Sequence, residues 1–297
     1  MKINKTSHDT MVSIGMPVYN GSEFIRKALD SLLNQTHKNF ELIISDNQST
    51  DNTEIIVQEY IKKDNRIRYI KRQKNEGAIS NLNKVFSMAN YDYFMWASHD
   101  DFWSKDYIEF CLDGFNLNNN IVLSTVISSI VDSNSEDEIA RDYGLDTTNI
   151  NSIKKFISYR KYLRTFPGAD CIFYGLFDRR SLLKVMPMQN VVASDHLLLS
   201  KLSLNGDFHR LHKNLFYKRD GGACESINSI VESIRLENKI LTSFPYLARE
   251  YFFQKIIFKT NSIQLYEKVI LSLWSINDYI DFRFYSRVMK LFSRILK

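Results

Sequence analysis

Apolar residues recur with two different periods along the first 130 residues of the chain. Four apolar runs have the length of buried strands: Met11–Tyr19, Phe40–Ser45, Ile67–Lys71 and Tyr91–Ala97. The segments between them place apolar residues three and four positions apart, which predicts helices with one buried face. Strands that alternate with helices predict an α/β fold of the Rossmann-like type, with a mostly parallel sheet flanked by helices.

The first predicted helix has a recognisable start. Asn20 precedes it, and Glu23 follows three residues later, which is the spacing of a capping box. The buried stripe of this helix comprises Phe24, Ala28, Leu29, Leu32 and Leu33. We therefore expect Asn20 to cap the helix. A later helix is predicted over Gly77–Ala89.

The pattern changes after the fourth strand. A helix is predicted over Ser104–Phe115 and a β-rich run over Ile121–Val131, whereas the acidic segment Asp132–Thr148 is interpreted as a loop. Residues 150–240 mix helix and strand, and the chain after Ser243 is helical and rich in aromatic residues. These changes divide the chain into a tail (1–10), a main domain (11–240, with halves at 11–131 and 132–240) and a C-terminal helical region (241–297).

Composition narrows the class of protein. The 297 residues are 44% apolar and 25% charged, as in a globular protein with a large core. The net charge of +5 does not by itself predict nucleic-acid binding. Cys111, Cys171 and Cys224 are widely spaced, which argues against a disulfide framework or a structural zinc site. Because no signal peptide or run of about 18 apolar residues occurs, we expect a cytoplasmic protein.

The last fifteen residues carry a charge asymmetry. Residues 283–297 contain five basic and no acidic residues. Apolar residues are interleaved at helical spacing: Phe284, Val288, Leu291, Phe292 and Ile295. Such a helix is able to lie on the anionic inner membrane, or to pack on the main domain with its charges in water. The sequence leaves both arrangements open.

Polar residues follow the predicted strands at their carboxyl ends, where open parallel sheets bind ligands. They are Pro17, Tyr19 and Asn20 after the first strand, Asp46–Asp51 after the second and His99–Asp101 after the fourth. Asp51 with Glu54 is explained as a helix cap. A cap leaves Asp46, directly at the strand end, unexplained, so we expect Asp46 to belong to a ligand site.

The adjacent acids Asp100 and Asp101 indicate a cation. Two neighbouring carboxylates repel each other unless a cation or hydrogen-bond donors compensate them, and Mg²⁺ or Mn²⁺ prefers such oxygen ligands. The alternative is a solvated helix start, since a helix is predicted from Ser104 and acids favour helix N-termini. No GxGxxG or GxxxxGK[ST] sequence is present, which disfavours dinucleotide-dependent dehydrogenases and P-loop enzymes.

Four stretches, in the expected order, resemble the family 2 glycosyltransferases of the GT-A fold, over about Val12–Ser226. They are VSIGMPVYN (Val12–Asn20), Gln35-Thr36 with Phe40–Asn47, Asn75-Glu76-Gly77 with Asn81, and His99-Asp100-Asp101. The last resembles the DXD motif of the family, which usually has Asp where this chain has His99. We expect His99 to be a core or hydrogen-bonding residue rather than a ligand.

The resemblance implies roles for residues of the half 11–131, which it makes the nucleotide-binding half. Pro17 and Tyr19 would line the nucleobase pocket, and Asp46 would accept a hydrogen bond from the base. Asp100 would lie near the ribose and donor sugar, and Asp101 would coordinate Mn²⁺ or Mg²⁺ on the diphosphate. Asn20 and Asn75 belong to the same motifs and are also expected at the donor site.

The half 132–240 would be the acceptor half. The segment Ala193–Leu199, followed by Gly206, resembles the family motif that supplies the catalytic base, which implies that role for Asp195. The alternative is that Asp195 caps the helix beginning there. Tyr217–Gly222 resembles a loop that closes over the diphosphate, with Lys218 or Arg219 as its cation.

Together these observations predict a metal-dependent, inverting glycosyltransferase. Its donor would be a nucleoside-diphosphate sugar and its acceptor a hydroxyl of a glycan or lipid-linked glycan. Two rivals are a sugar-phosphate nucleotidyltransferase and a non-catalytic carbohydrate-binding protein on the same fold. The first would need a Gly- and Arg-rich phosphate loop, which Asn20-Gly21-Ser22 does not supply, and the second should lack the base or the acid pair.

Overall fold

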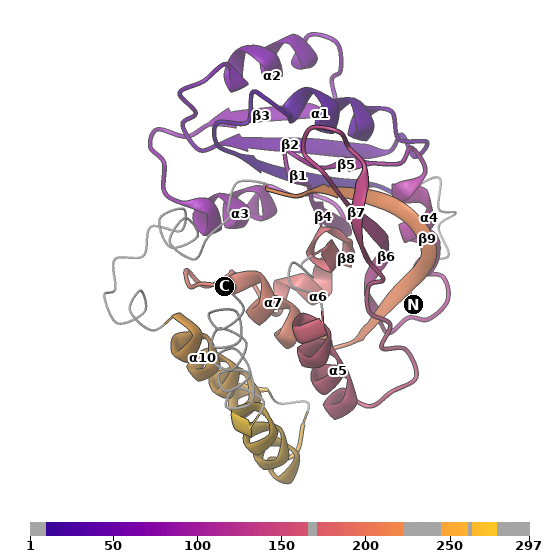
Figure 1. The fold of residues 1–297 in the computed structure, drawn as a ribbon, viewed down its shortest axis with the longest axis vertical. Helices are drawn as coiled ribbons and strands as arrows, with labels where there is room; N and C mark the ends of the chain where they lie inside the picture. The colour runs from indigo at the N-terminus through magenta and orange to yellow at the C-terminus, as the bar shows by residue number, and fades with distance from the viewer. Residues whose placement is uncertain (1–9, 166–170, 222–244, 261–262, 278–297) are drawn as a thin grey trace, which may run out of the picture.

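The computed structural model describes residues 10–165, 171–221, 245–260 and 263–277 of the chain (Figure 1). Its strands are β1 (Val12–Val18), β2 (Phe40–Asp46), β3 (Ile67–Lys71), β4 (Tyr93–Trp96), β5 (Phe102–Trp103), β6 (Ile121–Val131), β7 (Glu138–Asp142), β8 (Leu176–Asp178) and β9 (Asp207–Arg219). Its helices are α1 (Ile25–Leu33), α2 (Thr53–Ile61), α3 (Ala78–Ser87), α4 (Tyr107–Gly114), α5 (Ser152–Thr165), α6 (Arg179–Leu183), α7 (Ser194–Ser203) and α10 (Pro245–Lys259), with a 3₁₀ turn η2 (Cys171–Tyr174). Residues 265–277 are also helical.

The strands form one sheet in the order β3-β2-β1-β4-β8-β6-β9-β5, and β7 pairs with β6. The pairs β3–β2, β2–β1 and β1–β4 are parallel, as the alternation of strands and helices predicts. Beyond β4 the sheet becomes mixed, because β8 runs antiparallel to both β4 and β6. The long strands β6 and β9 are again parallel to each other. The predicted α/β class with a largely parallel sheet is confirmed.

Alternate residues of the central strands point to opposite faces of the sheet. Leu42 and Ile44 of β2 join an apolar cluster with α1, α2 and α4, whereas Ile43 joins a second cluster with α3, α5, α6 and α7. In β4, Met95 belongs to the first cluster, and Phe94 and Trp96 belong to the second. The sheet is therefore covered on both faces, and Figure 1 shows α1 and α2 on one side and α3, α6 and α7 on the other.

The segment Asp132–Thr148 corrects one prediction. We predicted a loop there, but residues 138–142 form the strand β7. It pairs with β6 in antiparallel orientation, with Arg141 of β7 opposite Ser129 of β6. The first four residues of β7 are exposed. Because β7 buries almost no side chains, it has no apolar alternation, and backbone pairing with β6 creates the strand.

The C-terminal helices share a core with the main domain. Phe253 and Ile257 of α10 and Leu271 pack with Phe156 of α5 and Leu197 of α7. The domain division at residue 240 stays a prediction. The basic segment 283–297 lies outside the described residues, so membrane contact and the cytoplasmic location also stay predictions. In the part of the chain that the structure describes, no helix has the length and apolar character needed to cross a bilayer.

Candidate active site

The candidate site lies at the edge of the sheet where β1, β2 and β3 end together. Val18 pairs with Asp46, and Asp46 pairs with Lys71, so the three carboxyl ends are level. The next strand, β4, ends three residues short of this edge, since Trp96 pairs with Gly15 and the amide of Ala97 donates to the carbonyl of Gly15. The loops after these strands carry the predicted donor-site residues, and the parallel register brings the loops together.

Asp46 is completely buried at the end of β2. One carboxylate oxygen accepts a hydrogen bond from the amide of Ser49 (2.7 Å), and the other accepts one from the hydroxyl of Tyr69 on β3 (2.7 Å). Burial, followed by the hydrogen bond to Asp46, raises the pKa of the Tyr69 hydroxyl. Asp46 therefore fixes the loop after β2, and its predicted contact with a nucleobase stays a prediction.

The loops after β1 and β2 are tied to each other. Asn20 has a positive φ of 51°, and its Oδ1 accepts a hydrogen bond from the amide of Thr50 (2.9 Å). The prediction that Asn20 caps α1 is wrong, because a turn over residues 22–24 separates it from the start of the helix at Ile25. Asn20 thus orders the strand-end loops.

Asp51 strengthens the same connection between loops. Its carboxylate accepts hydrogen bonds from the amide of Ser22 (2.9 Å) and from the amide and hydroxyl of Thr53 (3.0 and 2.5 Å). Burial opposes the charge, but the hydrogen bonds from Thr53 and Ser22 outweigh it and lower the pKa of Asp51 to about 2. Asp51 is therefore a charged link between the two loops as well as the local partner of Thr53.

The loop after β3 is joined to the edge through asparagines. Asn75 Oδ1 accepts hydrogen bonds from Asn47 Nδ2 (2.8 Å) and from the amide of Gly77 (2.9 Å). Asn81 on α3 donates to the carbonyl of Ser45 (2.8 Å), and its buried Oδ1 has no hydrogen-bond partner among the described residues. Gly77 has φ of 89°, which favours glycine, and it turns the chain into α3. Asn75 therefore lies at the predicted edge.

Two predicted nucleobase contacts differ in exposure. Pro17 is half-buried within β1, whereas Tyr19 is 44% exposed and available to a planar ligand. The ring of His99 lies on the backbone of Gly21, where an added Cβ would come within 2.5 Å of the His99 Cδ2 atom. His99 therefore packs the residues after β4 against the loop after β1, and its predicted structural role stays a prediction.

The acid pair lies between this loop and the end of β9. Asp100 and Asp101 are 8% and 3% exposed, and β5 follows them directly. The alternative interpretation, a solvated helix start, is therefore wrong. Asp100 accepts a hydrogen bond from the hydroxyl of Ser98, and Asp101 Oδ1 accepts one from the amide of Arg219 (3.0 Å).

The side chain of Arg219 is held at the end of β9 by the turn between β6 and β7. Its guanidinium donates to Glu136 (2.7 Å) and to the carbonyl of Ser133 (3.1 Å). It also lies over the rings of Phe24 (4.9 Å) and Phe102 (5.3 Å). Arg219 is only 5% exposed, so contact with a diphosphate would require it to leave Glu136. Sequence reasoning missed Glu136, which lies in the segment interpreted as a loop.

Asp195 lies in the first turn of α7, on the face of the sheet that α3 covers. The N-cap is Ala193, with φ of 57°, and among the described residues no amide donates to the Asp195 carboxylate. The interpretation of Asp195 as a helix cap is therefore wrong. Its side chain is about a quarter exposed. The connection before α7 is fixed to α3, because Asn83 and Met188 exchange two hydrogen bonds (2.9 and 2.8 Å).

The described residues contain no group of three or more His, Cys, Asp or Glu side chains arranged to hold a metal ion. Such a group is not required where substrate phosphates and water complete the shell, which is the usual arrangement for Mg²⁺. Asp101 offers a hard carboxylate that the Arg219 amide orients at the strand edge. The donor chemistry therefore fits an ion shared between one carboxylate and a diphosphate.

A family model described as glycosyl transferase family 2 matches residues 13–185. A putative teichuronic acid biosynthesis glycosyltransferase, TuaG of Bacillus subtilis, is 38% identical over 104 residues, which are 35% of this chain and 41% of TuaG. An uncharacterized glycosyltransferase of Haemophilus influenzae is 25% identical over 81% of this chain and 89% of its own length. The chain spans less than half the length of the first curated relatives it matches.

The fold is also shared with a solved structure. S. aureus TarS 1–349 in complex with UDP-GlcNAc superimposes with a TM-score of 0.66 at 16% identity, over 92% of this chain and 73% of that one. At this level of identity the likeness shows the fold alone. It is the GT-A arrangement that the sequence motifs resemble.

Proposed function

The chain belongs to glycosyl transferase family 2 and is a glycosyltransferase, and from this premise we propose that it moves a sugar from a nucleoside diphosphate to a hydroxyl of a glycan or lipid-linked glycan. The observation that carries the proposal is the convergence of the loops after β1, β2 and β3 at one sheet edge, beside the acid pair. TuaG, named for teichuronic acid biosynthesis, supports a glycan acceptor. TarS in complex with UDP-GlcNAc supports a nucleotide-sugar donor.

In this proposal the nucleotide lies across the level ends of β1, β2 and β3. Exposed Tyr19 and half-buried Pro17 face the base, and the hydrogen bonds of Asn20 with Thr50 and of Asn75 with Asn47 order the loops around it. Asp46 contacts the base only if Ser49 or Tyr69 yields one of its hydrogen bonds. Asp100, anchored by Ser98, lies beside the ribose and the donor sugar.

Asp101 would hold Mg²⁺ or Mn²⁺, which when bound offsets the charge that develops on the departing diphosphate. A mannosyltransferase of Pyrobaculum calidifontis with the same fold, whose structure holds GDP-Man and Mn²⁺, supports this ligand class (TM-score 0.52, 14% identity, 89% of this chain and 79% of that one). Arg219 would add a positive charge to the diphosphate after leaving Glu136.

Asp195 is the proposed base. Its carboxylate, about a quarter exposed, removes the proton from the acceptor hydroxyl while the hydroxyl oxygen forms its bond to the anomeric carbon and the carbon–diphosphate bond breaks. Because one direct displacement occurs, the configuration at the anomeric carbon inverts. Asp195 is suited to this task because, within the described part of the chain, no backbone cap occupies its oxygens.

The test separates the two acids. Asp195→Asn should lower sugar transfer by about 10²–10⁴-fold, the usual contribution of a general base, and leave donor affinity within about twofold of the parent protein. Asp101→Asn should instead weaken donor binding in the presence of Mn²⁺. Transfer is measured as release of nucleoside diphosphate over a panel of sugar nucleotides, and donor binding is measured by calorimetry with and without Mn²⁺.

Asp113→Asn is the matched control, because Asp113 is an exposed acid on α4. It should change neither quantity. Full transfer activity in Asp195→Asn would refute the base, and unchanged metal dependence in Asp101→Asn would refute the metal ligand. Release of pyrophosphate would instead favour a nucleotidyltransferase.

A further inference from the structure

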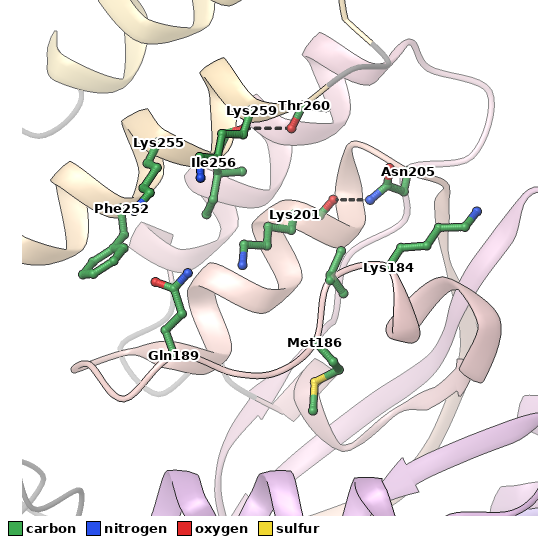
Figure 2. Close-up of a pocket in the computed structure, with 11 residues that line it drawn as sticks. Lys184, Met186, Gln189, Lys201, Asn205, Phe252, Lys255, Ile256, Lys259 and Thr260 are labelled. Atoms are coloured by element: carbon green, nitrogen blue, oxygen red, sulfur yellow. Dashed lines mark hydrogen bonds between the residues drawn. The ribbon is translucent and has the colours of Figure 1, made fainter.

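A cavity of about 610 Å³ lies between α7, the connection that leads into it, and α10 (Figure 2). Four lysines line it: Lys184, Lys201, Lys255 and Lys259. The rest of the lining is apolar or neutral and includes Gln189 and Asn205. Among the described residues no acid lines the cavity, so its lining carries positive charge only.

No ion pair with a described residue neutralises the four lysines, unlike two buried cations of the chain. Lys155 forms a buried ion pair with Asp207, and Arg160 forms one with Glu250. No such pair joins Lys184, Lys201, Lys255 or Lys259 to any residue that the structure describes. Among the described residues, the buried cations Lys155 and Arg160 are paired with acids, whereas partly buried Lys201 and the three exposed lysines of the cavity are not.

Helix ends account for part of this charge. Lys184 is the C-cap of α6, Lys201 lies in the last turn of α7, and Lys259 ends α10. A helix C-terminus carries about half a negative charge, so three ends supply at most about 1.5 negative charges against four ammonium groups. About 2.5 positive charges are left, which is more than one carboxylate neutralises.

Lys201 is the member of the cluster under greatest constraint. It is partly buried, and burial, followed by the charges of Lys255 and Lys259, lowers the pKa of its ammonium group. Figure 2 shows Lys201 on α7 facing Lys255 on the neighbouring helix. A bound anion would relieve this repulsion, so the site gains electrostatic energy on filling.

We propose that the four-lysine cavity binds a phosphoryl group carried by the acceptor. A phosphoryl group has a charge of about −2 and three acceptor oxygens, which match the residual charge and the rotatable donors of lysine. Lys201 lies six residues after Asp195 on α7, a rise of about 9 Å, so one helix carries both the proposed base and part of the cavity lining. The assignment to the acceptor rests on the proposed function.

The probe is inorganic pyrophosphate, titrated calorimetrically into the full chain in EDTA, so that the proposed metal site does not contribute. Lys201→Gln and Lys255→Gln should each weaken binding by about tenfold, the effect of losing one charge-assisted contact of about 1.4 kcal/mol. Lys255 is exposed, so its replacement tests the site without a risk to folding. Lys62→Gln, an exposed lysine on the C-cap of α2, makes the same change in net charge and should bind as the parent protein does.

Vesicles distinguish the source of the phosphoryl group. One result would overturn the acceptor assignment in favour of a lipid headgroup. In it, the parent protein floats with phosphatidylglycerol vesicles and fails to bind pyrophosphate, while Lys255→Gln no longer floats. Equal weakening in Lys62→Gln, or equal binding in all variants, would overturn the site itself. The pyrophosphate titration requires neither donor nor sugar transfer, so a negative titration leaves the proposed function standing. Absence of nucleoside diphosphate release would count against the proposed function alone.

Discussion

At the scale of single residues, the candidate site depends on close approaches that tolerate little change. The ring of His99 occupies the space above Gly21, and the hydroxyl of Thr53 accepts a hydrogen bond from the Gly21 amide (2.8 Å). This contact sets the distance between the end of β4, which carries Asp101, and the loop after β1, which carries Tyr19. Gly21, which has no proposed chemical role, thus determines how far apart Asp101 and Tyr19 lie.

Gly21→Ala should destabilise the protein by about 1–3 kcal/mol, because its Cβ would overlap the His99 ring and the structure must shift. Urea unfolding measures the loss. His99→Ala in the same chain removes the obstructing ring, so the double variant should recover part of the stability, while the Val18 Cγ2 atom, 2.7 Å from the added Cβ, still opposes it. Strictly additive effects of the two substitutions would show that the predicted clash does not occur.

At the scale of elements, the turn between β6 and β7 controls the end of β9. Glu136 in this turn pairs with Arg219, and it also contacts Lys27 of α1. The same strand end donates its backbone amide to Asp101. One turn therefore holds the cation proposed for the diphosphate and lies next to the proposed metal ligand.

Glu136→Gln should strengthen donor binding several-fold, because the glutamate and the diphosphate compete for one guanidinium. Arg219→Gln should weaken it. Calorimetry with donor and Mn²⁺ measures both, and Glu59→Gln, which breaks the exposed pair with Arg26, is the matched control without an effect. If Glu136→Gln weakened binding as Arg219→Gln does, the pair would position the site rather than compete with the donor.

At the scale of the whole molecule, the C-terminal helices complete the core. Arg160 of α5 and Glu250 of α10 form an ion pair (3.1 Å) in which both side chains are less than a tenth exposed. Ser275 donates to the same glutamate (2.5 Å), which brings the helix of residues 265–277 into the network. The network joins three helices and forms one wall beside the helix that presents Asp195.

Glu250→Gln should destabilise the chain by about 3–5 kcal/mol, because it removes the buried carboxylate that pairs with Arg160 and accepts from Ser275. Urea unfolding measures this loss. The paired replacement Arg160→Met with Glu250→Leu should recover most of the stability, since it removes both charges together. A small loss in Glu250→Gln would mean that the helices dock independently of this pair.

The sequence by itself determined the α/β class, the first four strands and the positions of the motifs. These features are set by local periodicity: Leu42 and Ile44 alternate with Ile43 because successive strand residues face opposite sides of a sheet. The acid pair could be located for the same reason, since it follows the apolar run that became β4. Family resemblance, rather than pattern, singled out Asp195.

The tertiary structure alone decided which side chains meet. Arg219 and Asp101 lie 118 residues apart, and Asn47 and Asn75 lie 28 apart, so no local pattern predicts their hydrogen bonds. Asn20 is a residue type that commonly caps helices. Its left-handed backbone conformation and its hydrogen bond from the distant Thr50 amide instead make it a link between two loops. The lysine cavity likewise forms only where the ends of α6, α7 and α10 converge. The interaction between the lysine charges depends on their separation in space and not on their separation along the chain.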